Sequence, residues 1–261
     1  MIVVDAPRRT LRPQEYMVVL DQTRLALEEI DRIVLPNPQQ PRLDWVIEDT
    51  SVNGVHRAVI VPRVIPANRR PPTVTATTTG LVHGVDQLRQ RAEIPPLFSA
   101  STVERIARIG KRVGERASAV HLSSTDDSDE AIVDQTTVEH AKQATHLARS
   151  AYGSVQGRLS VLSARRRGIS ASVMEEHSGR VVTVRAADDA TEQLRQAWGK
   201  RVQCAGVLTR NAVGQPIRLD LTELRVLPEQ VRVSASDILG IAPDYTGNLT
   251  TEEFIRHVRR S

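Results

Sequence analysis

The second half of the chain alternates apolar and polar residues in short runs, and this pattern constrains the fold more than any other feature. In the first run, Val155, Gly157, Leu159 and Val161 fall on one side of an extended strand, with other residues between them. A period of two residues is typical of half-buried β-strands rather than of helices. The runs that predict strands are residues 152–162, 169–174, 180–185, 201–210 and 217–221.

The segments between these strands predict turns and one helix. Arg165-Arg-Arg-Gly168 and Glu176-His-Ser-Gly179 each end in glycine, which tolerates the backbone of a tight turn. Asp189-Ala-Thr-Glu192 has the spacing of a capping box and predicts a short helix that ends near Trp198. Three strands, a helix and two strands is the element order of the OB-fold. We therefore predict a small five-stranded OB-like β-barrel over residues 151–228.

The first half predicts an α+β domain over residues 1–150, beginning with a frayed segment at residues 1–12. Asn53-Gly54 separates two apolar runs and predicts a hairpin, because both residues tolerate positive φ. Ser101-Thr-Val-Glu104 has the pattern of a capping box and predicts the start of a helix. We expect helices on one face of a small antiparallel sheet. The predicted strands are residues 43–48, 57–65, 117–123 and 130–134, and the predicted helices are residues 13–35, 74–91, 101–113 and 137–149.

Residues 229–261 predict a linker followed by a C-terminal docking helix. Thr250-Thr-Glu-Glu253 has the spacing of a capping box, and the arginines that follow suit the negative end of a helix dipole. A short apolar helix on a linker either folds back on the N-terminal half or docks on another protein, and the sequence leaves both alternatives open. The predicted partner-binding residues are Phe254, Ile255, Arg256, Val258, Arg259 and Arg260.

Binding of RNA or DNA is the second function that the sequence suggests. Arg165, Arg166 and Arg167 lie at the tip between the first two barrel strands, where OB-folds contact oligonucleotides. Arginines there could hold phosphates, but the next two strands contain no Phe, Tyr or Trp on which bases could stack. The net charge of +4 is modest, and only three of the 35 basic residues are lysines, an arginine excess typical of a GC-rich genome. We expect at most weak binding without sequence preference.

The sequence contains no motif for catalysis, for a cofactor or for a metal. It has no G-x-S-x-G, no Walker loop and no dinucleotide glycine fingerprint, so we expect a protein without enzymatic activity. Cys204 alternates with apolar residues, which predicts a buried, inert thiol. The acidic loop with Asp126, Asp127, Asp129 and Glu130 suits a solvated hairpin tip better than a hard-cation site. No apolar run approaches the roughly 20 residues that cross a bilayer, so we expect a cytoplasmic location.

Residues 152–228 resemble a domain of a family of bacterial proteins that has no established activity. The resemblance covers most of the second half of the chain and implies an OB-like fold without a known ligand. It rests on Tyr152-Gly-Ser-Val-Gln-Gly157, Gly179-Arg-Val-Val182, Trp198-Gly-Lys-Arg-Val202, Gly206-Val-Leu208 and Gly214-Gln-Pro216, and continues to Thr246-Gly247 and Glu252-Glu-Phe-Ile-Arg256.

The end of the chain resembles the C-terminal arms of antitoxins paired with PIN-domain ribonucleases. Such arms join a glycine-containing linker to a polar cap, two acids, two apolar residues and arginines. Here Leu239-Gly-Ile241 is followed by Thr250-Thr-Glu-Glu-Phe-Ile-Arg256 and then by Arg259-Arg260. The resemblance implies that the apolar pair fills a groove on a PIN-like nuclease and that Arg256 or Arg259 reaches the acidic metal site of that nuclease.

Overall fold

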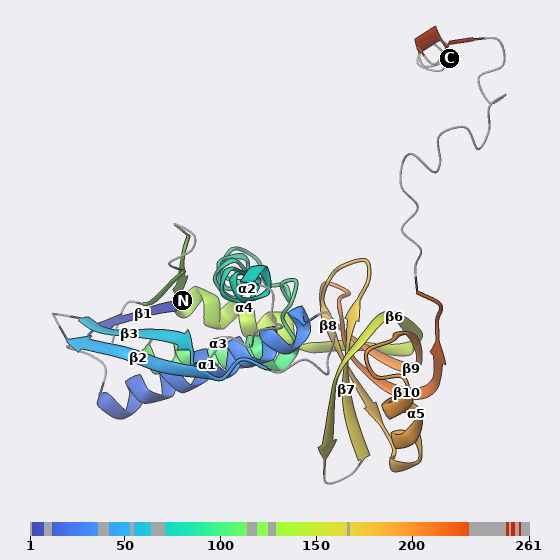
Figure 1. Cartoon of the computed structure of the whole chain (residues 1–261), viewed down its shortest axis with the longest axis horizontal. Coiled ribbons are helices and arrows are strands. Elements are labelled where there is room, and N and C mark those ends of the chain that lie inside the picture. The colour runs from blue at the N-terminus through green and yellow to red at the C-terminus, as the bar shows by residue number, and fades with distance from the viewer. Residues whose placement is uncertain are drawn as a thin grey trace. The chain divides into compact units, whose positions relative to one another are not determined.

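The computed structural model of the chain divides into two units, Met1–Leu227 and Pro228–Ser261, and Figure 1 shows the helices and strands of the first. The residues that the structure describes form a mixed α+β fold with five α-helices and two five-stranded sheets, both of them in the first unit. The described residues are 2–7, 12–35, 42–52, 55–63, 71–113, 119–124, 129–165, 168–229, 249–250, 252–253 and 256.

The first sheet is antiparallel throughout, with the strand order β2-β3-β1-β4-β5. β2 and β3 pair across the predicted hairpin, which confirms that prediction, while Asn53 and Gly54 themselves lie outside the described residues. The strands are β1 (Ile2–Pro7), β2 (Trp45–Val52), β3 (Val55–Pro62), β4 (Val120–Ser124) and β5 (Glu130–Val133).

The prediction of a frayed start at residues 1–12 is wrong, because β1 lies in the centre of this sheet. Its backbone pairs with β3 on one side and with β4 on the other. The side chains of Ile2, Val4 and Ala6 are buried. A strand of six residues is too short to establish a period in the sequence, and it is stabilised by neighbours that lie far away along the chain.

Four helices cover one face of the first sheet, as the sequence predicts. Burial alternates along β4, where Val120 and Leu122 are buried while His121 and Ser123 are partly exposed, as expected for a sheet covered on one side. Trp45 and Phe98 are among the largest side chains in the core between the two layers. The helices are α1 (Pro13–Val34), α2 (Pro71–Gln90), α3 (Ala100–Val113) and α4 (Gln135–Thr145).

Helix α3 begins before the predicted capping box, so that prediction is wrong. The backbone N–H of Thr102 donates to Ser99 Oγ over 3.1 Å, and the backbone N–H of Ser99 donates to Thr102 Oγ1 over 3.3 Å. These reciprocal bonds make Ser99 the N-cap, with Thr102 in the place that a glutamate usually takes. Glu104 is instead exposed and lies 3.9 Å from Arg108.

Helix α4 begins two residues before the predicted Thr137, because Asp134 is its N-cap. The backbone N–H of Thr137 donates to Asp134 Oδ1 over 2.9 Å, and Arg89 Nε donates to Asp134 Oδ2 over 2.9 Å. Partial burial acts to raise the pKa of Asp134, but these hydrogen bonds outweigh it and hold the pKa below its usual value. The helix ends at Thr145 rather than near Arg149, since β6 begins at Leu147.

Asp134→Ala is expected to destabilise the chain by about 1–2 kcal/mol at pH 7, because it removes a helix cap and the partner of Arg89. The folded-state pKa lies below the unfolded-state value of about 3.9. The contribution of the carboxylate is therefore complete above that value and is lost as the pH falls through the folded-state pKa. Urea unfolding at pH 7 and at pH 3 should show a smaller difference between the two chains at pH 3.

A control for this experiment is Glu139→Ala, which removes an exposed carboxylate from the same helix. We expect it to change stability by less than about 0.5 kcal/mol. An effect of Asp134→Ala that is equal at both pH values would contradict the electrostatic part of the account.

The pairings of the second sheet close into a barrel in the order β10-β8-β7-β6-β9. Only the β8–β10 pairing is parallel. All five predicted strands and the predicted helix are confirmed, although the Asp189 side chain makes no capping bond and α5 begins only at Thr191. The elements are β6 (Leu147–Arg165), β7 (Gly168–Glu175), β8 (Val181–Ala186), α5 (Thr191–Gln196), β9 (Arg201–Asn211) and β10 (Pro216–Val226).

The barrel and the α+β part of the first unit are joined by backbone and side-chain hydrogen bonds. The N–H of Leu97 donates to the carbonyl of Gly179 over 3.0 Å, and the N–H of Val181 donates to the carbonyl of Phe98 over 3.3 Å. Asn211 Nδ2 donates to the carbonyl of Ala144 and to Gln215 Oε1, each over 2.9 Å. The N–H of Ile94 donates to the same Gln215 oxygen over 2.8 Å. These bonds tie the loop between α2 and α3 and the end of α4 to the barrel.

Candidate functional site

In the sequence, the predicted nucleic-acid-binding residues stand at the end of β6 and before β7. Arg165 is the last residue of β6, and its backbone pairs with Gly168. Gly168 has a φ of 95°, as the predicted turn requires of its glycine. The side chain of Arg165, and all of Arg166 and Arg167, lie outside the described residues.

Of the predicted partner-binding residues, only Arg256 lies within the part of the chain that the structure describes. Arg256 is exposed and lies 3.9 Å from Glu252, one helical turn before it. The remaining residues, Phe254, Ile255, Val258, Arg259 and Arg260, lie outside the described residues.

The predicted capping box of the C-terminal helix is present. The N–H of Thr250 donates to Glu253 Oε2 over 2.9 Å, its hydroxyl donates to the same oxygen over 2.8 Å, and the N–H of Glu253 donates back to Thr250 Oγ1 over 3.4 Å. The hydrogen bonds from Thr250 hold the pKa of Glu253 below its usual value. The cap is made entirely by residues of the second unit.

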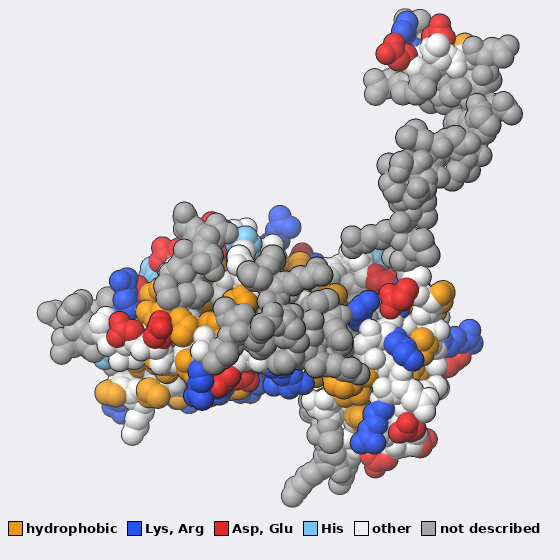
Figure 2. Space-filling model, in the orientation of Figure 1, with side chains coloured by type: hydrophobic (Ala, Val, Ile, Leu, Met, Phe, Trp, Pro, Cys, Tyr) orange, Lys and Arg blue, Asp and Glu red, His pale blue; other side chains and the backbone are white. Residues whose placement is uncertain are grey.

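The outer face of β6, β7 and β8 carries hydroxyl side chains where an oligonucleotide-binding barrel would carry aromatic ones. The strand register places Ser163 opposite Ser170, and Ser172 opposite both Val161 and Thr183. The alternate residues, such as Ala171 and Val184, point into the barrel core. The visible face of the molecule in Figure 2 likewise shows acidic and basic side chains interspersed, without one continuous basic surface.

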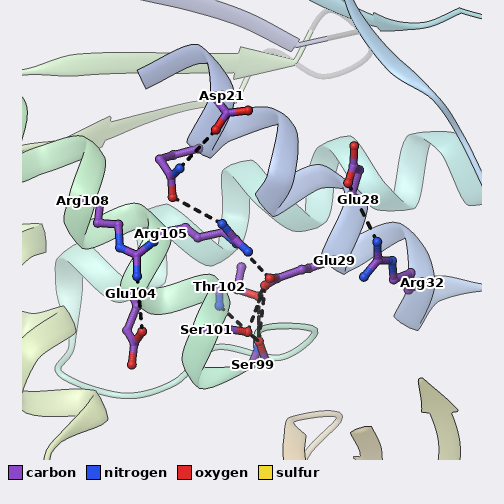
Figure 3. Close-up of polar contacts among 11 residues, drawn as sticks. Asp21, Glu28, Glu29, Arg32, Ser99, Ser101, Thr102, Glu104, Arg105 and Arg108 are labelled. Carbon is purple, nitrogen blue, oxygen red and sulfur yellow. Dashed lines mark hydrogen bonds and ion pairs between the residues drawn. The ribbon is translucent and has the colours of Figure 1, made fainter. Parts of the chain in front are cut away.

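A cluster of polar side chains around Glu29 joins α1 to the start of α3 (Figure 3). Glu29 Oε1 accepts from Arg105 Nε over 2.8 Å. Glu29 Oε2 accepts from the hydroxyls of Thr102, Ser101 and Ser99 over 2.7, 3.2 and 3.5 Å. We call these five residues the Glu29 cluster. The carboxylate therefore has both a charge partner and hydroxyl donors within the protein.

A cavity of about 140 Å³ lies between the Glu29 cluster and the hydroxyl-bearing face of the barrel, and we call it the junction cavity. Arg32 of α1 also lines it. The Nε of Arg32 is buried and has no acceptor among the described residues, while one terminal nitrogen lies 3.9 Å from Glu28 Oε2. The barrel contributes the side chains of Val161, Ser163, Ser170, Ser172 and Thr183.

Sequence reasoning missed the junction cavity altogether. Glu29 and Arg32 fall on the polar face of a predicted helix, and the serines fall on the outer positions of predicted strands. Each position is ordinary by itself. Ser99 and Glu29 are separated by 70 residues along the chain, so no local pattern connects them.

A second cavity, of about 320 Å³, lies where α2 meets the loop before α3. Its arginine from the barrel, Arg180, donates from Nε to the carbonyl of Ile94 over 2.8 Å and lies 3.5 Å from Glu93. Gln215 Nε2 donates to the same Glu93 carboxylate over 3.4 Å. Arg180 and Glu93 thus belong to the joint between the barrel and the α+β part.

The remaining candidate residues have structural surroundings. Cys204 is buried in the barrel core, as predicted, and burial raises its pKa to about 12. In the acidic loop, Asp129 contacts His83 and Glu130 contacts His121, whereas Asp126 and Asp127 lie outside the described residues. No group of three metal-binding side chains occurs among the residues that the structure describes.

No helix in the described parts of the chain is long and apolar enough to cross a membrane.

Comparison with known proteins adds no family to these observations. No protein-family model matches the chain, and no curated protein matches its sequence.

Proposed function

We propose that the chain is a non-catalytic binding protein that engages a protein partner through its C-terminal arm, residues 229–261. The observation that carries this proposal is the separation of Pro228–Ser261 from the rest of the chain as a compact unit of its own. The arm also starts a helix with a complete capping box, so the helix needs no residue of the first unit to begin. Both properties suit a segment that is offered to another molecule.

The arm has the chemistry for an acidic partner. Arg256 is exposed, and Arg259 and Arg260 follow it in the sequence. Arginine presents a planar fork of donors that binds carboxylates through two hydrogen bonds. We propose that the partner is a PIN-like nuclease whose acidic metal site the arm blocks, with Phe254 and Ile255 as the apolar anchors.

We also propose that the barrel is OB-like. In support, the first strand of the barrel pairs with the second and the fourth, and the third pairs with the fifth in parallel. The helix α5 lies between the third and fourth strands. This order agrees with the five-stranded Greek-key barrel of the OB-fold.

Nucleic-acid binding through the barrel is the alternative function, and the geometry favours it less. Strands β7 and β8 contain no aromatic side chain, β6 contains the single exposed Tyr152, and α1 and α3 pack beside these strands. A single strand that stacks on OB-folds gains about 1–3 kcal/mol per stacked base, and one tyrosine could stack only one base. Only the turn around Arg165 would be left to hold phosphates.

A charge-reversal experiment tests the proposal. The full-length chain and its Arg256→Glu variant are used to capture proteins from a lysate of the native host, and mass spectrometry identifies them. We expect one partner, a nuclease, to be lost with Arg256→Glu. The matched control is Arg225→Glu, since the side chain of Arg225 is 69% exposed and that of Arg256 is 67% exposed.

The control variant should keep the partner. Loss of the partner with both variants would point to a non-specific charge effect, and retention by both would contradict a role of Arg256 in docking. A partner that binds only to the first unit, Met1–Leu227, would be retained by the wild type and by both variants.

A further inference from the structure

The junction cavity contains more hydrogen-bond donors than the protein itself uses. The side chains of Ser163, Ser170, Ser172 and Thr183 line the cavity from three adjacent strands, and none makes a side-chain hydrogen bond with a residue that the structure describes. Ser170 is only 6% exposed. Ser163 is exposed, and Ser172 and Thr183 are partly exposed, so these hydroxyls are accessible to water or to a ligand in the cavity. The barrel side of the cavity thus offers a set of convergent hydroxyls.

Arg32 supplies a cation from the opposite wall. Its Nε is buried without an acceptor among the described residues, and its nearest carboxylate, Glu28, is 3.9 Å away. Burial lowers the pKa of Arg42, and the positive charge of Arg32 lowers it further. A second guanidinium therefore lies close enough to Arg32 for the two charges to repel each other. The Nε of Arg32 itself is not accessible, so an oxyanion in the cavity would be bound by the terminal nitrogens of the guanidinium, whose fork can donate two hydrogen bonds.

Glu29 also lines the cavity, and its negative charge repels an anion only weakly. Glu29 is held by Arg105 Nε at 2.8 Å, and its other oxygen accepts from the Thr102 hydroxyl at 2.7 Å. The charge of Glu29 is thereby balanced within its own cluster, as Figure 3 shows. The donors of the Glu29 cluster are used by Glu29, whereas the barrel hydroxyls have no side-chain partner among the described residues and Arg32 has only Glu28 at 3.9 Å. A ligand would therefore sit on the barrel side.

The size of the cavity suits a ligand of a few heavy atoms. Pockets for drug-sized ligands begin at about 300 Å³, whereas the junction cavity has about 140 Å³. A tetrahedral oxyanion fits inside it, and a larger ligand would extend beyond it into solvent.

We propose that the junction cavity binds a small oxyanion of the size of inorganic phosphate, between the guanidinium of Arg32 and the hydroxyls of Ser170, Ser172 and Thr183. The proposal concerns the first unit and is independent of the function proposed for the arm. A bound anion would bridge α1 to β7 and β8, and would stabilise the contact between the α+β part and the barrel.

Thermal unfolding and calorimetric titration of the full-length chain with inorganic phosphate test this proposal, against sodium chloride at the same ionic strength. A ligand that binds only the folded chain raises the unfolding temperature in a saturable way. We expect phosphate to do so at millimolar concentrations, and chloride not to. Arg32→Gln should weaken phosphate binding at least tenfold. Thr183→Val, which keeps the shape of the side chain and removes its hydroxyl, should weaken binding several-fold.

The matched control is Arg108→Gln, which removes an exposed arginine of α3 that lies 3.9 Å from Glu104 and does not line the cavity. It should bind phosphate as the wild type does. Phosphate binding that is unchanged in both Arg32→Gln and Thr183→Val would overturn the assignment of the site. The absence of any binding heat and of any shift beyond that of chloride in the wild-type chain would overturn the proposal itself.

Discussion

Gly157→Ala is expected to lower the free energy of unfolding by about 3 kcal/mol, because overpacking of this kind has no side chain that can move away. Gly157 lies in β6 opposite Glu175 of β7. A Cβ added there would overlap the carbonyl oxygen of Met174 and the backbone of Glu175. These are backbone atoms, so relief requires the two strands to separate where their pairing begins. Urea unfolding of the full-length chain measures the effect.

Gly153→Ala is the control for this prediction, since it places the same methyl group in the same strand. The nearest atom to its added Cβ is a side-chain carbon of Leu208 at 3.4 Å, which is ordinary contact. Its effect should stay within about 0.5 kcal/mol. Equal effects of the two substitutions would contradict the role given to the close approach of β7.

Asn211→Ala should destabilise the chain by about 3 kcal/mol, because it leaves several buried polar groups without partners. Asn211 is 1% exposed and donates to the carbonyl of Ala144 and to Gln215. Its own Oδ1 accepts from the N–H of Gln215 over 2.8 Å. Gln215 Oε1 in turn accepts from the N–H of Ile94. One substitution therefore weakens two contacts between the barrel and the α+β part.

Gln203→Ala serves as the control in the same strand, because Gln203 is only partly buried and its one side-chain contact, to Ser154, is 3.5 Å long. We expect a change below about 1 kcal/mol for this control. Denaturant unfolding followed by two probes tests whether the joint is lost first. Trp45 reports the α+β part and Trp198 reports the barrel. Coincident transitions in Asn211→Ala with unchanged stability would contradict the role given to the network.

The barrel could be predicted from the sequence because its information is local. The sequence alternates over residues 152–162 of β6 and 201–210 of β9, and glycines such as Gly168 mark turns between the strands. The same holds for α1, whose period extends over 22 residues. Where the pattern was long, the element and its approximate bounds were found.

The errors occurred where distant residues decide the structure. β1 is held by β3 and β4, which follow it by some fifty to more than a hundred residues. The start of α3 was assigned to Ser101 because Glu104 completes the usual pattern, whereas the chain uses Ser99 with Thr102. Both choices satisfy the backbone N–H groups of a first turn, and packing of the hydroxyls against Glu29 of α1 distinguishes them.

The junction cavity could not be predicted, because it depends on how three strands and two helices meet. Arg32, Ser99 and Ser172 come from three separate segments, and each is a common residue type at an ordinary position. The arm is the opposite case. Its capping box at Thr250 and Glu253 was predicted from four adjacent residues and is present.

The most direct test of the account compares proteins captured from the native host by the full-length chain and by a chain that ends at Pro228. The shortened chain keeps the whole first unit, Met1–Leu227, with both sheets and the joint between them. We predict that one protein partner is captured by the full-length chain and is absent from the sample of the shortened chain. Identical sets of captured proteins would contradict the proposed role of the arm and would direct attention to the barrel instead.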